Sequence, residues 1–555
     1  MKKNKEVVAK KNNTKTLNKP SGETTLIKLE NFLLKNETLI FFSILLISFI
    51  FSVLLFDIKM SEGNDDSDYI EGAFKLTKDF KSYYSTKAPL YPIFLSLPVS
   101  LFGINLPILK SLSILFSLLN LTAMYYAFRK LIPYSILFTI LIFTGINSYF
   151  LYFASQTYSE AFFCFLQALL FVALRPILIA AKEDNIPLGK YLVFGIILTL
   201  LSLTKNITVG AIAAVALYNI LNRDFKKLAY TFGSFIVVRG IFETIKSFIW
   251  GSQNQFSNQY QILIQKDPYN VSKGVDDFGG FVDRLFSNTS IYIGKRLYQI
   301  LGFVSPDNTK TNAGLVLITF VFIGIGLYFI FKNKNKIMQF TFLYVLLMAG
   351  LTFFVLQTSW DQPRMVLVYV PFILMITFYG LYYTFQSTPA LRSSVFLIVS
   401  IIIIMSSLIK TIDKSLANLP ILKKNMGGDI YYGYTEDWTN FLKLSRYCGD
   451  SLPESAYVVS RKAPMSFIYS QGKSFYPIYT VPSTDPDSVL ALLKENKVTH
   501  VLIASLRRNP KKNDGYVINT LHRMMGPVGQ KYPDKLKLVK QVGINEPSYL
   551  YEIKY

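Results

Sequence analysis

Long runs of apolar residues, separated by short charged turns, make up most of residues 38–410. Runs such as 39–56, 192–203 and 395–409 contain no charged residue, and uninterrupted apolar stretches of this kind are typical of membrane-spanning helices. We therefore expect a polytopic α-helical membrane protein with about eleven transmembrane helices. The predicted spans are residues 38–57, 106–128, 131–150, 156–180, 188–204, 206–222, 229–250, 312–331, 337–357, 364–385 and 393–410.

Three other stretches are interpreted differently. Residues 1–37 are polar and rich in lysine, which predicts a disordered tail in the cytosol. The apolar run that follows starts too late, and lacks the small-residue cleavage site, to be a cleavable signal peptide. Residues 89–103 (PLYPIFLSLPVSLFG) are short and contain prolines, so we expect an interfacial or re-entrant helix. Residues 251–310 form a second large outer loop, with helices expected to lie on the membrane.

Residues 411–555 carry charge, proline and short strand-like runs, which predicts a small α/β domain. One helix is expected to begin at Asp485-Pro486, because an aspartate cap followed by proline is a typical helix start. The predicted strands are Tyr457–Ser460, Val498–Ala504, Leu536–Val542 and Tyr549–Lys554.

The net charge of +23 would suggest nucleic-acid binding in a soluble protein. Here hydrophobic residues make up 51% of the chain and charged residues only 17%, so a membrane explanation is stronger. Basic residues collect on the cytoplasmic side of membrane helices, and the predicted inner loops hold ten basic and three acidic residues. With the N-terminus in the cytosol, an odd number of spans places the C-terminal domain on the extracytoplasmic side of the plasma (inner) membrane.

The first outer loop, residues 57–105 with the interfacial helix, is the first candidate for chemistry. Asp65, Asp66, Asp68 and Glu71 fall within seven residues, directly after the first span. A carboxylate in this place can accept a proton from a hydroxyl or amine nucleophile, or position it. The alternative is an ordinary solvated, charged loop.

Four further charges fall at the ends of membrane segments, on the same predicted outer side as Asp65: Lys87, Glu160, Lys205 and Arg364. A lysine at the membrane surface is a natural partner for a lipid phosphate, although it can also simply extend its ammonium to the interface. Ionisable groups at membrane depth are costly and usually functional. Taken singly, each could be an interfacial anchor; together they suggest a cavity for an anionic substrate.

The order of several short motifs is informative. Residues 65–73 read DDSDYIEGA, residues 87–90 read KAPL, and residues 203–206 read LTKN. Glu160 follows a serine on the next outer loop, and Arg364 precedes Pro371. In this order the motifs resemble those of the GT-C superfamily of membrane glycosyltransferases, in the branch of protein O-mannosyltransferases and lipid A aminoarabinose transferases. The patterns of that branch are D-[DE]-x-x-Y-x-x-x-A, K-P-P-L, L-T-K-G and R-Y-x-x-P, from which Ala88, Asn206 and Met365 depart.

The resemblance implies a transferase that uses a sugar linked to a polyprenyl phosphate, such as undecaprenyl or dolichyl phosphate. Transfer to a glycan, lipid or protein acceptor would occur on the extracytoplasmic face with inversion at the anomeric carbon. Among the catalytic residues Asp65, Asp66 and Glu160, the first would act as base. Tyr69 and Asp68 would support the acceptor or the loop. The donor phosphate would be bound by Lys87, Arg364 and, more weakly, Lys205.

Two questions remain open at this point. A divalent cation (Mg²⁺ or Mn²⁺) could sit at Asp65, Asp66 and Glu160, because carboxylates suit hard cations. The alternative function is a lipid-linked glycan flippase or another transporter. A transporter is expected to have internal repeats and charges near the membrane midplane, whereas this sequence has no evident repeat and its charges collect at one surface.

Overall fold

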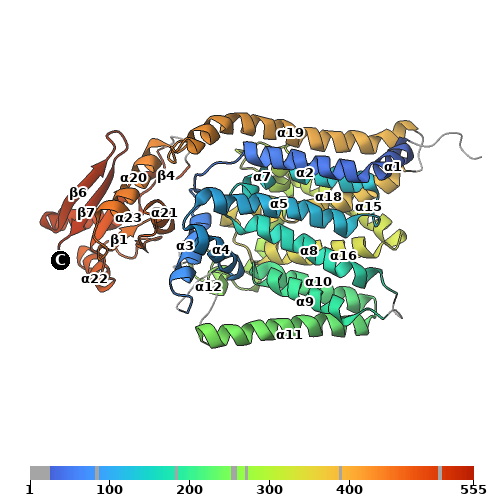
Figure 1. Ribbon diagram of the computed structural model, residues 1–555, viewed down its shortest axis with the longest axis horizontal. Coiled ribbons are helices and arrows are strands. Elements are labelled where there is room, and N and C mark those ends of the chain that lie inside the picture. The colour runs from blue at the N-terminus through green and yellow to red at the C-terminus, as the bar shows by residue number, and fades with distance from the viewer. Residues whose placement is uncertain are drawn as a thin grey trace, which may run out of the picture.

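The structure is a computed structural model that describes residues 25–81, 87–181, 185–251, 259–268, 273–386, 390–509 and 515–555. Figure 1 shows a large bundle of helices, with a smaller domain that contains all the strands at one end. The two parts are joined by α19 (Ala390–Met426), which runs the length of the bundle and continues beyond it. The predicted boundary at residue 410 therefore falls inside one unbroken helix.

In the described part of the chain, seven helices of the bundle are long and apolar enough to cross a membrane. A bent pair, α6 (Tyr134–Ile146) and α7 (Ser148–Ala154), makes an eighth span if counted as one. The seven are α2 (Glu37–Leu54), α5 (Leu106–Phe128), α8 (Ser159–Ile179), α11 (Phe225–Trp250), α15 (Ala313–Lys332), α16 (Lys336–Val355) and α19.

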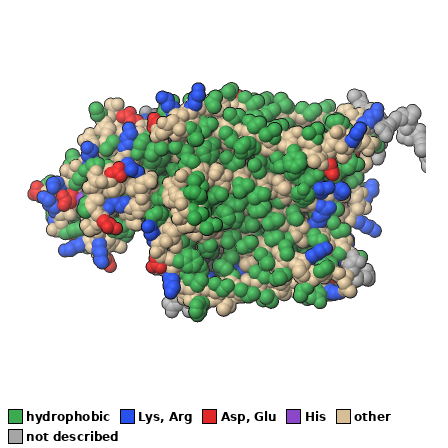
Figure 2. All heavy atoms as spheres, viewed as in Figure 1, with side chains coloured by type: hydrophobic (Ala, Val, Ile, Leu, Met, Phe, Trp, Pro, Cys, Tyr) green, Lys and Arg blue, Asp and Glu red, His purple; other side chains and the backbone are tan. Residues whose placement is uncertain are grey.

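The other three predicted spans are helical but shorter than a membrane-length helix: α9 (Leu188–Ser202), α10 (Val209–Leu221) and α18 (Val370–Phe385). Among the described residues, seven or eight of the eleven predicted spans are thus of membrane length, and the other three are these shorter apolar helices. Figure 2 shows a wide belt of hydrophobic side chains over the bundle, which fits a lipid-facing surface. The protein is a multi-pass membrane protein.

The bend between α6 and α7 has a clear local cause. Asn147 interrupts the apolar run, and its side-chain oxygen accepts a hydrogen bond from the Tyr149 N–H at 3.0 Å, which caps α7. Its side-chain nitrogen donates to the Ile300 carbonyl at 2.8 Å and to Ser407 Oγ at 2.7 Å. Because a buried amide has to satisfy its polar atoms, Asn147 fixes the 59° angle between the two helices.

The N-terminal prediction needs a correction, because α1 (Thr25–Lys35) is a helix within the segment expected to be disordered. Glu30 of α1 accepts hydrogen bonds from the Tyr134 and Ser135 N–H groups at 2.8 and 2.9 Å, at the start of α6. Those N–H groups have no partner inside their own helix, so α1 satisfies them. Residues 1–24 lie outside the described part of the chain.

The remaining helical elements cover the predicted outer segments. The expected interfacial helix is α4 (Leu90–Phe102), preceded by α3 (Asp65–Lys78). Within 251–310, the described elements are helical, as expected. They are α12 (Gln259–Ile264), α13 (Phe278–Ile291), a π-helical turn (Tyr292–Arg296) and α14 (Leu297–Ile300). Short turns at Asn206–Thr208 and Thr358–Trp360 precede α10 and α17 (Arg364–Leu367).

The C-terminal domain is the expected α/β unit. Its main sheet has the order β2-β1-β3-β7-β6, in which β1 pairs parallel with β2 and β3, and β7 pairs antiparallel with β3 and β6. The strands are β1 (Val458–Ser460), β2 (Phe475–Pro477), β3 (His500–Ala504), β6 (Leu536–Val542) and β7 (Ser548–Ile553), with β4 (Leu506–Arg507) and β5 (Val517–Ile518) forming a separate pair. The helices are α20 (Glu436–Ser451), α21 (Ala463–Tyr469), α22 (Pro486–Glu495) and α23 (Thr520–Lys531), with a turn at Pro533–Lys535. Asp485 caps α22, as predicted, by accepting from the Ser488 N–H at 2.9 Å.

Candidate active site

The acidic motif forms the start of α3. Asn64 has a left-handed backbone (φ 77°) that turns the chain into the helix, and Asp65, Asp66 and Asp68 occupy the first turn. Negative side chains there are favoured by the partial positive charge of the helix N-terminus. The segment is therefore a helix that holds its carboxylates at a fixed place just after the first span, and it is not the solvated, charged loop that was the alternative.

Asp65 lies between two cations that come from distant parts of the chain. Its Oδ1 is 3.0 Å from Lys87 Nζ, and its Oδ2 is 2.6 Å from Arg364 Nη1. Burial alone would raise the pKa of Asp65, but the two cations outweigh it and hold the pKa well below the usual range. Asp65 is therefore ionised at physiological pH, with both oxygens engaged.

Asp66 has a different environment from its neighbour. It is fully buried, and its oxygens accept hydrogen bonds from the N–H groups of Ser61 and Ser67, both at 2.8 Å. Burial raises its pKa to about 6, although these hydrogen bonds oppose the shift. Asp66 thus holds the preceding loop against α3 and does not face the cations that bind Asp65.

Lys87 is the centre of a second set of contacts. Its ammonium is 3.0 Å from Asp65 and 2.7 Å from Asp68, and lies over the Tyr69 ring at 4.6 Å from the ring centre. Burial would lower the pKa of Lys87, but the two carboxylates raise it, so the side chain stays charged. Tyr69 and Asp68 therefore hold Lys87 beside Asp65, and the Tyr69 hydroxyl reaches Ser159 Oγ at 3.2 Å.

Glu160 and Lys205 form the third part of the cluster. Lys205 Nζ is 2.8 Å from Glu160 Oε1, and Glu160 is only 4% exposed at the start of α8. The other oxygen of Glu160 and Nε of Arg364 are both buried and have no hydrogen-bond partner among the residues that the structure describes. Buried polar atoms without partners are rare, and here they leave one acceptor and one donor for a ligand or water.

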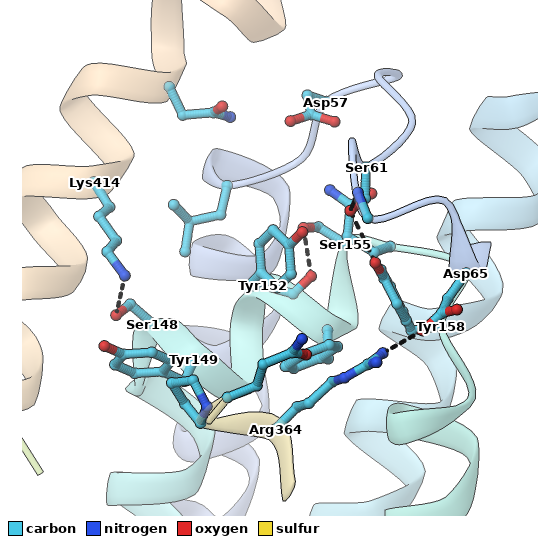
Figure 3. Close-up of a pocket in the computed structure, with 17 residues that line it drawn as sticks. Asp57, Ser61, Asp65, Ser148, Tyr149, Tyr152, Ser155, Tyr158, Arg364 and Lys414 are labelled. Carbon is cyan, nitrogen blue, oxygen red and sulfur yellow. Dashed lines mark hydrogen bonds and ion pairs between the residues drawn. The ribbon is translucent and has the colours of Figure 1, made fainter. Parts of the chain in front are cut away.

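Beside Asp65 and Arg364 lies a cavity of about 640 Å³ (Figure 3). Its wall is polar and rich in tyrosine, and Figure 3 shows Arg364 reaching toward Asp65 on one side and Lys414 on the other. The lining residues are Leu55, Asp57, Ser61, Gly63, Asp65, Ser148, Tyr149, Tyr152, Phe153, Ser155, Gln156, Tyr158, Gln362, Pro363, Arg364, Lys414 and Asn418.

The structure thus brings together several of the residues that the sequence analysis predicted for the site. Asp65, Asp68, Lys87 and Arg364 are joined by ion pairs, and Glu160 pairs with Lys205. Asp66 lies beside them, but its oxygens are turned to backbone N–H groups.

Comparison with known proteins places this arrangement in a wider context. No protein-family model matches the chain, and no curated protein matches it. Several solved structures, however, match the chain. ArnT from Cupriavidus metallidurans in the apo state superposes with a TM-score of 0.51 at 11% identity, over 93% of this chain and 98% of that one. The chain has a GT-C fold.

Two further GT-C structures have the same fold. An Archaeoglobus fulgidus oligosaccharyltransferase, tethered to an acceptor peptide containing the NVT sequon, gives a TM-score of 0.57 at 11% identity, over 93% of this chain and 74% of that one. Oligosaccharyltransferase AglB of the same organism, in complex with an inhibitory peptide and a dolichol-phosphate, gives 0.51 at 11% identity, over 84% and 70%. These enzymes and ArnT are membrane glycosyltransferases.

The carboxylates of this GT-C chain do not make a metal site in the structure. The part of the chain that is described contains no group of three His, Cys, Asp or Glu side chains that could hold a metal ion. The three carboxylates suggested as ligands point to different partners: Asp65 to two cations, Asp66 to N–H groups, and Glu160 to Lys205. Their arrangement therefore fits cationic side chains, not a shared divalent ion.

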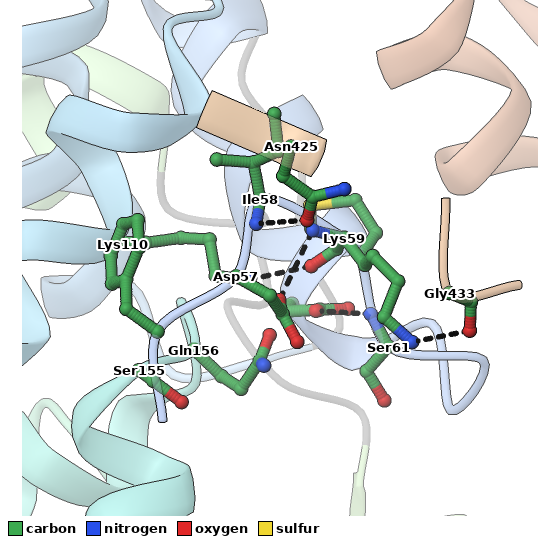
Figure 4. Close-up of polar contacts among 12 residues, drawn as sticks. Asp57, Ile58, Lys59, Ser61, Lys110, Ser155, Gln156, Asn425 and Gly433 are labelled. Atoms are coloured by element: carbon green, nitrogen blue, oxygen red, sulfur yellow. Dashed lines mark hydrogen bonds and ion pairs between the residues drawn. The ribbon is translucent and has the colours of Figure 1, made fainter. Parts of the chain in front are cut away.

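The 57–64 loop, which carries the chain from α2 to Asp65, is held by residues that the sequence analysis missed (Figure 4). Lys110 of α5 is completely buried and donates to Asp57 Oδ1 at 2.7 Å and to the Lys59 carbonyl at 2.6 Å. Asn425 of α19 accepts from the Ile58 N–H at 3.2 Å. A lysine inside the apolar run 106–128 was a signal that could have been recognised, because such a charge needs a partner.

The C-terminal domain holds the second half of this loop. Lys462 donates to the Glu62 carbonyl at 2.5 Å, and the Met465 N–H donates to Asn64 Oδ1 at 3.2 Å. The Tyr434 hydroxyl donates to the Met60 carbonyl at 2.6 Å. The domain is therefore in direct contact with the segment that positions Asp65.

Proposed function

We propose that this protein is a glycosyltransferase that moves a sugar from a polyprenyl-phosphate-linked donor to an acceptor at the outer surface of the membrane. The observation that carries the proposal is the Asp65 carboxylate held between Lys87 and Arg364, at the edge of a polar cavity. The GT-C fold supports it, since the AglB structure with the same fold is a complex with a dolichol-phosphate.

The proposed reaction is a single displacement. An acceptor hydroxyl oxygen bonds to the anomeric carbon as the bond from that carbon to the phosphate oxygen breaks, which inverts the configuration. The hydroxyl proton passes to Asp65, and the bonding electron pair leaves with the polyprenyl phosphate. Charge develops on the leaving phosphate, so fixed cations stabilise the transition state.

The ion pairs of Asp65 suggest how donor binding would activate this carboxylate as the base. A carboxylate with a depressed pKa is a weak base. A donor phosphate would replace Asp65 as the partner of Lys87 and Arg364. The Nε atom of Arg364, which has no hydrogen-bond partner among the described residues, would donate to the phosphate as well. Asp65 would then lose the charges that lower its pKa and become a stronger base once the donor is in place. Glu160 would help by holding Lys205 in the cluster, with Lys205 as a third, weaker phosphate ligand.

We also propose that the active site faces the outside of the cell. Lys and Arg side chains gather at the end of the bundle opposite the C-terminal domain (Figure 2), the end expected to lie in the cytosol. The 57–64 loop, the cavity and the C-terminal domain would then be extracytoplasmic.

A transfer assay tests the proposal. Purified full-length protein is incubated with a panel of radiolabelled polyprenyl-phosphate sugars and membrane extracts as the acceptor source. We expect release of polyprenyl phosphate with the label in a new product, and release about 10³-fold slower from Asp65→Asn. Movement of an intact lipid-linked glycan across proteoliposomes, without cleavage at the anomeric carbon, would instead identify a flippase.

A further inference from the structure

Arg364, which would bind the donor phosphate, lies in a part of the chain that does not hold its shape by itself. It begins α17, a helix of only four residues that follows the turn at Thr358–Trp360. A helix this short is not stable alone, so the position of Arg364 depends on how the residues beside it are anchored. Val366 and Leu367 anchor the chain after Arg364 by burial. A second anchor lies before it, at Asp361.

Asp361 is held by two cations from a distant segment. Its Oδ1 is 2.6 Å from Nε of Arg296, and its Oδ2 pairs with the Lys295 ammonium. Arg296 Nη2 also donates to the main-chain carbonyl of Asp361 at 2.6 Å. Hydrogen bonds between ionised groups are stronger than neutral ones, and a forked arginine adds a fixed geometry. The side chain and the main chain of Asp361 are therefore both fixed in place.

The two cations belong to the π-helical turn Tyr292–Arg296, between α13 and α14. The turn makes a third contact with the same stretch, because the Tyr292 hydroxyl donates to the Trp360 carbonyl at 3.2 Å. Single π-helical turns inside α-helices are rare and frequently occur at functional sites. Here the turn holds residues 360 and 361, just before Arg364.

The π-helical turn is itself firmly anchored. Lys295 is only 2% exposed, and Arg296 Nη1 donates to Oε1 of Gln299 at 2.6 Å. Gln299 is fully buried, and its amide donates to the Ser305 carbonyl at 3.1 Å. Separating a buried cation from its counter-ion is strongly unfavourable, so Lys295 keeps Asp361 in place. The contact therefore differs from an exposed ion pair, which contributes little to stability.

The link from Asp361 to Arg364 is short and stiff. Only Gln362 and Pro363 lie between them. The ring of Pro363 fixes its φ angle, here −55°, and a proline also restricts the residue before it. A shift of Asp361 would therefore move Arg364 and would not be absorbed by the linker. Because Arg364 reaches from there to Asp65 (Figure 3), such a shift would disturb the donor cluster.

We propose that Asp361 is a positioning residue of the donor site: held by Lys295 and Arg296, it fixes the place from which Arg364 contacts the donor phosphate. The contact of Arg364 with the phosphate rests on the proposed function. The fixing of Asp361 is argued from its own ion pairs. The outer segment 251–310 thereby becomes part of the donor site, although it contributes none of the residues assigned to the phosphate.

Binding of undecaprenyl phosphate to the full-length protein in detergent tests the proposal without acceptor or turnover. Microscale thermophoresis gives Kd. We expect Arg364→Ala to raise Kd about tenfold and Asp361→Asn about fivefold, the latter within the range for residues coupled through a shared contact. Asp361→Glu, which keeps the charge, should recover part of the loss. In the Arg364→Ala background, Asp361→Asn should raise Kd less than about twofold, because Asp361 acts through Arg364.

The matched control is Asp283→Asn, an exposed aspartate of α13, which should bind the lipid as the wild type does. If Asp361→Asn does not fold, Arg296→Lys takes its place, because a lysine keeps the charge but lacks the fork that bonds to side chain and carbonyl together. The same rise in Kd in both backgrounds would show that Asp361 acts on the whole fold and would overturn the proposal.

An unchanged Kd in Asp361→Asn would overturn the proposal as well. Either of these results, with normal binding by the wild type, leaves the proposed function standing. No binding by the wild type would overturn the phosphate role of Arg364 and this proposal together, so the two failures are distinguishable.

Discussion

Asp65 Oδ2 and Arg364 Nη1 lie 2.6 Å apart although 299 positions separate the two residues in the sequence. Asp65 begins α3 after the first span, and Arg364 begins α17 before α18. The ion pair therefore joins early and late parts of the membrane domain at the edge of the cavity. Four predictions concern this site and its support, and a fifth concerns the orientation of the protein.

Replacing Asp65 with asparagine should remove the base and keep the shape of the side chain. We expect kcat for sugar transfer to fall by about 10³-fold, within the usual range for loss of a general base. Size-exclusion chromatography should show an unchanged, folded protein. The control is Asp79→Asn, an exposed aspartate just after the same helix, which should keep most activity. Normal transfer by Asp65→Asn would remove its role as base.

Removing one of the two cations should weaken donor use. We expect Lys87→Ala and Arg364→Ala each to raise KM for the lipid-linked donor by about tenfold or more, since hydrogen bonds to charged groups contribute about 1.5–3 kcal/mol. Initial rates measured against donor concentration give this value. Lys78→Ala, an exposed lysine in the last turn of α3, is the control. Unchanged donor kinetics in both variants would contradict a phosphate-binding role.

The buried pair of Lys110 and Asp57 should matter for stability. Lys110→Met leaves the Asp57 carboxylate without its ammonium, and breaking a buried ion pair typically costs about 3–5 kcal/mol. We expect the thermal unfolding midpoint in detergent to fall markedly, and Lys110→Met/Asp57→Asn to recover part of the loss. Lys130→Met, at the exposed cytosolic end of α5 in our topology, should change it little. A double variant no better than the single one would argue against the ion pair as the cause.

Asp66 should make stability depend on pH in a defined direction. Its pKa is about 6 in the folded chain against 3.8 as the ordinary value, so the folded state binds a proton first as the pH falls. The contribution of Asp66 to the free energy of unfolding therefore rises as the pH falls from 7 toward 4, by about 1 kcal/mol at pH 5 and about 3 kcal/mol below pH 4. Unfolding midpoints of the wild type and Asp66→Asn are compared at pH 7.5 and 5. The midpoint of the wild type should rise relative to that of Asp66→Asn as the pH falls. A constant difference would contradict the buried, titrating carboxyl.

Cysteine labelling should establish the orientation of the chain. Lys78→Cys and Ser451→Cys are exposed and should react with an impermeant maleimide from outside whole cells, whereas Lys334→Cys should react only after permeabilisation. The native Cys164 and Cys448 are both buried, which keeps the background low. Protection of either outer position would place the cavity on the cytosolic side. Ser67 is unsuitable for this experiment because its side chain is buried.

Much of the helical fold could be predicted from the sequence, because apolar runs between charged turns report directly on helices in a membrane. All eleven predicted spans are helical, and the four predicted strands occur. Their lengths were harder to predict. The run 131–150 is broken by Asn147, and α9, α10 and α18 are shorter than their apolar runs, since hydropathy does not show where a polar side chain bends a helix.

The candidate site could be predicted in part. Asp65, Lys87, Glu160, Lys205 and Arg364 stand out as charges at the ends of apolar runs, and the structure joins them in ion pairs. The cavity could not be predicted in the same way, because its wall consists of serine, tyrosine and glutamine residues that are unremarkable in a sequence. The contacts of Lys462 and Asn425 with the 57–64 loop depend on how two distant segments pack, which no local pattern reports.

The single helix α19 has a consequence for how the chain can change in evolution. Asn418 donates to the Leu54 and Phe56 carbonyls. Asn425 lies two turns later on the same face and accepts a hydrogen bond from the Ile58 N–H. The helix α19 therefore holds the chain leading to Asp65 at two fixed positions, Asn418 and Asn425. Adding or deleting one residue between Asn418 and Asn425 would rotate Asn425 by about 100° around the helix axis and break its hydrogen bond to the loop. We expect insertions to be tolerated in the turns of the bundle but not in this seven-residue interval.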